Sequence, residues 1–306
     1  MTDRFSRREF LRRAGIVSAA VGGLTLAGDE ILGFLEEAEA ASKSTLAIAS
    51  KGSPEVLVKK AIDGLGGIGK FVKKGGSVVI KPNLAWARTP AQAANTNPKL
   101  LTALIKMCQQ AGAGKITVLD HTCDNANAAF AVNGAKDVCA ATKVRLISTD
   151  KKFMYKRVNI PKGKILKSDD CASEILSADC FINVPIAKVH GASVITASMK
   201  NMMGANWDRQ AWHQSGLDQC IADFSTVVKP DLIILDAIRI MLTRGPKGPG
   251  DTKDVGQVIA GTDPVAIDAY AATLLGRKPQ EIGHIKCAAA LGLGQIDLKK
   301  VNLRRM

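Results

Sequence analysis

Polar side chains follow several strand-like segments of this chain, and their types are those that bind anions and move protons. The groups are Lys81-Pro82-Asn83, Asp120-His121, the segment from Asn183 to His190, and Asp236. In open α/β sheets, ligands gather at the carboxyl ends of the strands. A proline in the first and in the third group ends the strand and turns the chain there. The sequence therefore predicts a polar crevice built from several strand ends.

Lys188-Val189-His190 is the sharpest local pattern. Alternate residues of an extended segment point the same way, so the ammonium and the imidazole are expected on one face. Because a neighbouring cation lowers the pKa of each group, the pattern favours a neutral imidazole that acts as a base or a metal ligand. A second imidazole follows an aromatic residue in Trp212-His213. We predict His190, Lys188, His213 and Asp120 as catalytic residues, and His190, His213 and His121 as candidate metal ligands.

The segment from Met199 to Gly204 is expected on a short helix, and it adds a second cation and an amide. Its methionines are expected to pack in the core. Asp263 is most simply the N-cap of a helix that begins at Pro264, whereas Asp268 lies one turn inside that helix among apolar neighbours. The predicted ligand-binding set, for a small anion, is Lys81, Asn83, Lys200, Asn201, Asp236, Asp263 and Asp268.

Strand-like and helix-like patterns alternate along the chain and must position these side chains. Strands are expected at Thr45–Ala49, Ser77–Ile80, Ile116–Leu119, Val144–Ser148, Cys180–Val184, Leu232–Leu235 and Val255–Ala260. Helices are expected at Pro54–Gly64, from Pro98 to near Gly112, and at Cys171–Ser177, Leu217–Val227 and Pro264–Leu275. This alternation predicts an α/β fold with a mostly parallel sheet and helices on both faces. Short alternating runs at Tyr155–Ile160 and Gly163–Leu166 predict a small basic β insertion around residues 150–168.

The chain is basic, with a formal net charge of +14. The excess is concentrated between Lys143 and Lys167, where nine Lys or Arg residues accompany a single acid, Asp150. Such a run is a solvated face, a docking surface for an acidic protein such as a redox partner, or a patch that lies on anionic lipid headgroups. Nucleic acid is not expected as a partner, because only Phe153 and Tyr155 offer stacking groups in this segment.

Cysteine usage and motif content restrict the cofactor classes. The seven cysteines include no C-x-x-C pair, so a cysteine-ligated iron–sulfur cluster is not expected. Most of them lie in apolar patterns and are expected to be small buried hydrophobes, except Cys123, which lies in a polar loop beside His121. No G-x-G-x-x-G, P-loop, G-x-S-x-G or H-E-x-x-H motif occurs, which argues against dinucleotide, P-loop, serine-hydrolase and zincin chemistry. A bound metal ion stays compatible with the histidines.

The first 40 residues have the pattern of a twin-arginine export signal. Arg7-Arg8 precedes Phe10-Leu11, an apolar run covers Ala14–Ala27, and Ala38-Glu39-Ala40 offers an A-x-A cleavage site. The run is too short to span the roughly 30 Å hydrocarbon core as a stable helix. The alternative is an ordinary basic N-terminus before a core helix. The pattern predicts a signal peptide at 1–40, transport by the twin-arginine translocation machinery, and a single α/β domain at 41–306 in the periplasm.

From about Lys43 to Gly276 the sequence resembles the DUF362 family. The resemblance rests on Val79–Asn83, Thr96–Pro98, Ala178–Pro185, Lys188–His190, Lys200–Gly204, His213 and Asp263–Asp268, in this order. Members of that family have no defined activity, and some carry ferredoxin-type iron–sulfur modules, whereas this chain lacks the four-cysteine run. The resemblance supports the site at the strand ends and does not name a substrate. The residues lead to the hypothesis of an exported enzyme or redox-associated accessory protein with an anion-binding Lys/His/Asn pocket. The alternative is a non-catalytic module that binds a ligand or cofactor and docks a partner through the basic segment.

Overall fold

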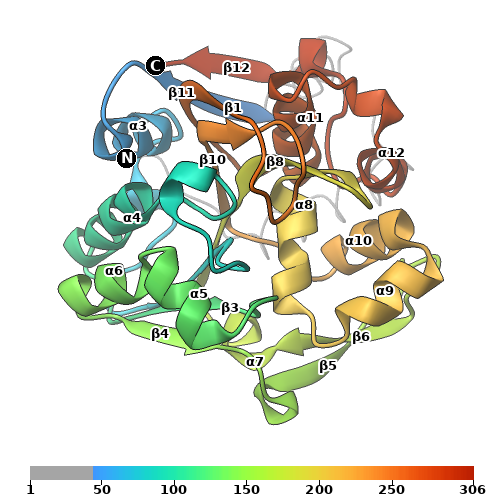
Figure 1. The fold of residues 1–306 in the computed structure, drawn as a ribbon, viewed down its shortest axis with the longest axis horizontal. Helices are drawn as coiled ribbons and strands as arrows, with labels where there is room; N and C mark the ends of the chain where they lie inside the picture. Colours follow the sequence, from blue (N-terminus) through green and yellow to red (C-terminus); the bar gives the residue numbers. More distant parts are fainter. Residues whose placement is uncertain (1–43) are drawn as a thin grey trace, which may run out of the picture. The chain divides into compact units, whose positions relative to one another are not determined.

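Strands from the whole described part of the chain, residues 44–306 of this computed structural model, assemble into one mixed sheet (Figure 1). The strands of this sheet are β1 (Thr45–Ser50), β2 (Ser77–Pro82), β3 (Lys115–Asp120), β4 (Arg145–Ser148), β7 (Cys180–Val184), β8 (Ile186–His190), β9 (Val194–Thr196), β10 (Leu232–Met241), β11 (Thr252–Gly261) and β12 (Asn302–Arg305). They lie in the order β12-β1-β11-β10-β7-β2-β3-β4, with β8 paired to β10 and to β9.

Most of the neighbouring strands run parallel. The ladder β10-β7-β2-β3-β4 is parallel throughout, whereas β11 is antiparallel to both β1 and β10. Every residue of β7 is buried, as expected for a central strand that is covered on both faces. The predicted α/β class with a mostly parallel sheet is confirmed.

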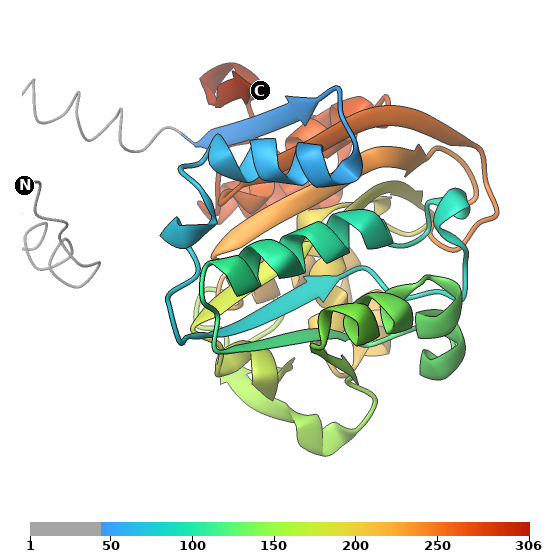
Figure 2. The ribbon, with the colours of Figure 1, turned by 90° about the vertical axis from the view of Figure 1, so that its left-hand side faces the viewer.

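Helices cover both faces of the sheet. They are α3 (Pro54–Asp63), α4 (Pro98–Gln110), α5 (Ala126–Val132), α6 (Ala135–Thr142), α7 (Ser173–Leu176), α8 (Ser198–Asn201), α9 (Arg209–Ser215), α10 (Leu217–Ser225), α11 (Pro264–Leu274) and α12 (Gly283–Ala290). Figure 2 shows α3, α4 and α6 in front of the sheet, where α3 and α4 pack against each other, and the C-terminal helices behind it. Two separate hydrophobic clusters fill the two faces.

Helix α4 illustrates how the sequence determines where a helix begins and which of its faces is buried. The Asn97 side chain accepts a hydrogen bond from the Lys99 amide, and Pro98 is the first helical residue, an N-terminus of the expected kind. Leu101, Leu104 and their neighbours on the same face are buried. The helix therefore packs its apolar face on the sheet and leaves its N-terminus beside the strand ends.

The basic insertion is a β hairpin, but its second strand lies further along the chain than expected. Strand β5 (Tyr155–Asn159) pairs antiparallel with β6 (Ser168–Ala172), so the predicted strand at Gly163–Leu166 is wrong and the predicted helix at Cys171–Ser177 is reduced to α7. The Asp223 carboxylate accepts hydrogen bonds from the amides of Ile165 and Leu166, which satisfies those donors without a strand partner. A side chain at Gly163 would lie 1.9 Å from the Leu166 carbonyl oxygen, so this turn requires glycine.

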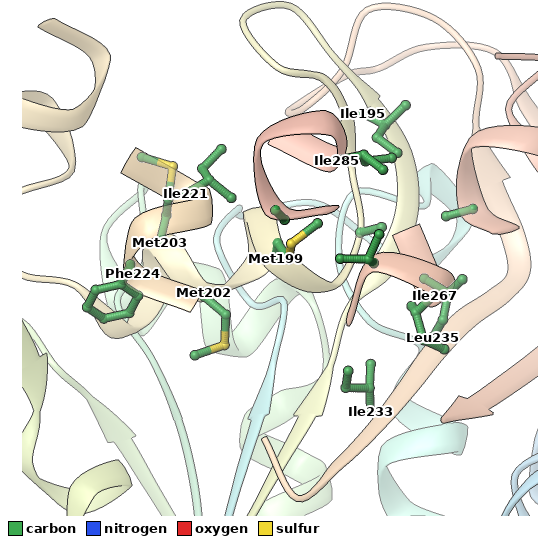
Figure 3. Close-up of a cluster of buried hydrophobic side chains, with 14 of the residues drawn as sticks. Ile195, Met199, Met202, Met203, Ile221, Phe224, Ile233, Leu235, Ile267 and Ile285 are labelled. Atoms are coloured by element: carbon green, nitrogen blue, oxygen red, sulfur yellow. The ribbon is translucent and has the colours of Figure 1, made fainter. Parts of the chain in front are cut away.

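The methionines of the segment from Met199 to Gly204 pack in the core, as expected. Met199 of α8 and Met202 and Met203 of the turn that follows it are buried together with Ile221 and Phe224 of α10 (Figure 3). Cys123 is exposed, Cys287 is partly buried and the other five cysteines are buried. Within residues 44–306, no helix has both the length and the apolar character needed to cross a membrane. The expected export signal at 1–40 lies outside the described residues.

Candidate functional site

A cavity of about 400 Å³ lies where β2, β3 and β8 end. Its wall is completed by β9, α8, α9 and the loops near Trp86 and Pro246. The residues that line it are Lys81, Asn83, Ala85, Trp86, Asp120, His121, Cys123, Lys188, His190, Thr196, Lys200, Asn201, Met203, Gly204, Arg209, Gln210, His213 and Pro246. All of the predicted catalytic residues and metal-ligand candidates, together with Lys81, Asn83, Lys200 and Asn201, are therefore brought to one cavity.

A buried ion pair joins the ends of β2 and β3. Lys81 Nζ lies 2.8 Å from Asp120 Oδ1, and both side chains are almost completely inaccessible. Asp120 also accepts hydrogen bonds from the amides of Leu84 (2.7 Å) and His121 (3.0 Å). A Cβ atom at Gly204 would lie 2.0 Å from Asp120 Oδ1 and 2.7 Å from Lys81 Nζ. Only glycine allows the segment after α8 to close over this pair.

A chain of side-chain amides holds the floor of the cavity. Asn83 Nδ2 donates to Asn201 Oδ1 at 2.9 Å, and Asn201 Nδ2 donates to Asn183 Oδ1 at 2.8 Å. Lys188 Nζ donates to Asn83 Oδ1 at 3.2 Å and to the Ala94 carbonyl. Because each amide has a fixed donor and acceptor, the orientation of all three is determined.

Positive charge dominates the cavity. Burial lowers the pKa of Lys188 to about 7 and that of Lys200 to about 8. Lys200 is only 9% exposed, and its ammonium has no hydrogen-bond or ion-pair partner among residues 44–306. Arg209 donates to the carbonyl oxygens of His121 (2.8 Å) and Thr122 (3.0 Å) and forms no ion pair within residues 44–306. In the part of the chain that the structure describes, the only carboxylate that lines the cavity is Asp120, which pairs with Lys81.

One ring nitrogen of His121, Nε2, has no hydrogen-bond partner among residues 44–306. Its Nδ1 lies 3.3 Å from the Asn206 carbonyl and 3.2 Å from the Tyr155 hydroxyl, which itself donates to the Thr149 carbonyl. Nδ1 is therefore the protonated nitrogen, and Nε2 is an acceptor. The ring stacks on Trp207. Burial and then Arg209 lower the pKa of His121, so the ring is neutral and suited to accept a proton.

His190 has the opposite tautomer. Its Nδ1 accepts hydrogen bonds from the amides of Ala192 (3.0 Å) and Ser193 (3.3 Å), so Nε2 carries the proton. Burial, then Lys200 and Lys188, lower the pKa of His190 to about 3. The sequence predicts His190 as a base or metal ligand, whereas the geometry makes it a neutral hydrogen-bond donor and gives the accepting role to His121.

His213 lies exposed on α9 at the rim of the cavity, and burial followed by Lys200 and Arg209 lowers its pKa. Among residues 44–306, no group of three or more His, Cys, Asp or Glu side chains is placed to hold a metal ion. The three histidines that the sequence groups as metal ligands thus share a cavity but do not form a ligand cluster there.

Three predicted ligand-binding carboxylates, those of Asp236, Asp263 and Asp268, do not line the cavity. The first two are held by backbone amides. Asp236 accepts hydrogen bonds from the amides of Asn97 (2.7 Å) and Ile238 (3.0 Å), and burial raises its pKa to about 6. Asp263 caps α11 through the Ala266 amide and also accepts from the Gln295 amide. Both carboxylates are occupied by backbone donors, so the structure does not join them to the anion site.

Asp268 supports the cavity from behind. It accepts hydrogen bonds from the amides of Ser198 (2.5 Å) and Met199 (3.1 Å), the first residues of α8, which carries Lys200. His284 lies between Asp268 (3.4 Å) and Asp218 (3.6 Å) and is completely buried. Burial alone would lower the pKa of His284, but the two carboxylates raise it above its ordinary value. The buried His284 ring thus lies against the carboxylate that anchors α8.

Sequence reasoning missed Arg209, Thr196, Gln210 and the aromatic wall at Trp86. Arg209 is the first residue of α9 and follows no strand. Its arrival in the cavity depends on the packing of α9 against α10. No spacing in the sequence signals that contact.

Comparisons with known proteins identify relatives of this chain. The family model of a domain of unknown function, DUF362, matches residues 78–273. A thylakoid-associated protein of Synechocystis is 27% identical over 256 residues, covering 79% of this chain and 76% of that protein. Two solved structures share 13% and 9% identity: the lactate racemase apoprotein of Thermoanaerobacterium thermosaccharolyticum (TM-score 0.43) and a Thermotoga maritima protein (TM-score 0.45). They align with 80% and 78% of this chain, which spans 56% and 60% of theirs.

Lys188 is expected to make stability depend on pH. An unfolded lysine has a pKa of about 10.4, so between about pH 7 and pH 10 the unfolded chain binds a proton that folded Lys188 does not. Stability of the wild type should therefore rise with pH relative to Lys188→Met, by up to about 1.4 kcal/mol per pH unit. Urea unfolding of both proteins at about pH 7 and about pH 9 measures the difference. If the unfolding free energies of the two proteins changed equally with pH, burial would not disfavour the charged form of Lys188.

Asp268 and Asp263 are expected to differ in their contribution to stability. Asp268→Ala leaves His284 with one carboxylate and uncaps α8, which should cost about 3–5 kcal/mol. Asp263→Ala removes a helix cap and should cost about 1–2 kcal/mol. Urea denaturation of the two variants provides the comparison. Equal losses would show that the buried ionic group does not support α8.

Proposed function

This chain belongs to the DUF362 family, a domain of unknown function, and we propose that its cavity binds a small carboxylate anion and transfers protons at that ligand. The observation that carries the proposal is Lys200. A nearly buried ammonium that has no partner is unfavourable unless a bound anion neutralises its charge. Arg209 and Lys188 add donors and charge in the same cavity, which suits the recognition of a carboxylate.

The two imidazoles supply the acid–base chemistry of this proposal. His121 offers an unprotonated Nε2 and acts as the base, while His190 offers Nε2–H and stabilises a negative oxygen that develops on the substrate. Both rings are neutral because burial and cations lower their pKa values. Opposite tautomers in one cavity support a proton-transfer enzyme over a module that only binds a ligand.

Export is part of the proposal. The Arg7-Arg8 signal pattern would carry the folded protein through the twin-arginine pathway to the periplasm, where it would meet its substrate. A role as a redox-associated accessory protein is a separate hypothesis from the sequence. The non-catalytic alternative, a module that holds its ligand unchanged, makes the same use of Lys200 but has no use for the His121 lone pair.

Lys200→Met is expected to weaken anion binding at least about tenfold, because it removes a charge-assisted hydrogen bond. Malonate is a suitable probe, and isothermal titration calorimetry measures its Kd. In the wild type the affinity should fall as the pH rises from about 6.5 to about 9, since Lys188 and Lys200 lose their protons in this range. Lys299→Met, at an exposed lysine without an ion pair, is the control. Unchanged affinity in Lys200→Met would overturn the anion site.

His121→Ala is expected to abolish proton transfer while malonate binding persists. Exchange of carbon-bound hydrogen for solvent deuterium, followed by proton NMR over a panel of 2-oxo and 2-hydroxy carboxylates, measures the activity. Loss of a positioned base should slow exchange by about 100-fold or more. Malonate binding without exchange of any panel member, in the wild type, would favour the non-catalytic alternative.

A further inference from the structure

The hairpin of β5 and β6 carries a strongly basic surface. We use the name basic hairpin for residues 151–167, which contain no Asp or Glu, whereas β6 adds the buried Asp169 and the partly buried Asp170. Its Lys and Arg side chains are all exposed: Lys151, Lys152, Lys156, Arg157, Lys162, Lys164 and Lys167. None of them lines the cavity, so this surface is independent of the proposed anion site.

Little of this charge is neutralised within the fold. Asp170 forms ion pairs with Lys152 and, at 3.5 Å, with Arg157. Within residues 44–306, Lys151, Lys156, Lys162 and Lys164 form no ion pair. The surface therefore keeps a positive potential that attracts an extended anionic partner.

An aromatic side chain protrudes from the same surface. Phe153 is 85% exposed, more than any other large hydrophobic residue described. It lies in the 3₁₀ turn η3 (Lys152–Met154), which is anchored on the core by Met154 and by the buried Tyr155. Figures 1 and 2 agree in placing this turn at the lower edge of the ribbon. The fold thus holds the turn in place while it presents Phe153 outward.

We propose that the basic hairpin binds a membrane surface rich in anionic lipid, with Phe153 inserted between the headgroups and the lysines in contact with lipid phosphates. A phenyl ring that protrudes among long cationic side chains matches the boundary of a bilayer, where the ring enters the apolar edge and the ammonium groups stay at the headgroups. A protein partner of standard size would call for an extended, shape-complementary surface with a desolvated centre. The sequence pattern alone allows both partners, and the protruding Phe153 favours the membrane.

Vesicle co-sedimentation of the full chain tests this proposal. We expect binding to phosphatidylcholine vesicles that contain about one-third phosphatidylglycerol, weak binding to pure phosphatidylcholine, and loss of binding between about 50 mM and about 500 mM salt. The double variant Lys151→Glu with Lys156→Glu should lower the partition coefficient at least about tenfold. Phe153→Ser should lower it about threefold to tenfold, because an apolar contact is lost.

Matched controls separate this surface from general charge and hydrophobicity. Lys299→Glu with Lys300→Glu makes the same change in net charge beside β12, which Figure 1 places at the end opposite the hairpin. Val56→Ser removes an exposed apolar side chain on α3. Both controls should keep wild-type binding. No binding of the wild type to anionic vesicles at low salt, or equal binding of the hairpin variants and their controls, overturns the proposal and leaves an acidic protein as the partner.

Discussion

The ion pair between Lys81 and Asp120 is the constraint on which the site depends. It links the ends of β2 and β3, and the same carboxylate receives the amides of Leu84 and His121, which begin the two loops of the cavity wall. Breaking such a buried pair typically costs about 3–5 kcal/mol, because one charge is left without compensation. Gly204 lies directly against it. The position of His121 and the closure of the segment after α8 therefore follow from one interaction.

Buried polar groups are used in two ways around the cavity. Asn83, Asn201 and Asn183 satisfy one another and the Lys188 ammonium, which makes the floor rigid and leaves little capacity for a ligand. Lys200 and the Nε2 atoms of His121 and His190 belong to residues that line the same cavity, and they have no hydrogen-bond partner among residues 44–306. Behind them, Asp268 and His284 lie in contact under the N-terminus of α8. Rigid support and unsatisfied donors together favour the proposed anion site.

The fold could be predicted in outline because its central strands are short apolar runs bounded by turn residues. Strand β7 has the bounds expected for it, and α4 and α11 begin at the expected caps. The elements that escaped prediction lack such signals. Strand β9 has only three residues, and α12 has no side-chain cap at its N-terminus. Both are stabilised by neighbours distant in the sequence, since β9 pairs with β8 and α12 packs on α10.

The sequence by itself determined part of the cavity, including Lys81, Asp120 and Lys188, because polar side chains that follow parallel strands emerge at one edge of the sheet. The tertiary structure decided what each of them can do. Asn83 and Asn201 are 118 residues apart, and Arg209 arrives on a helix that follows no strand. Whether an imidazole donates or accepts depends on which backbone groups pack beside it: two amides turn His190 into a donor, and one carbonyl leaves His121 an acceptor. Protonation and pairing are properties of packed neighbours, which residue types and spacing do not encode.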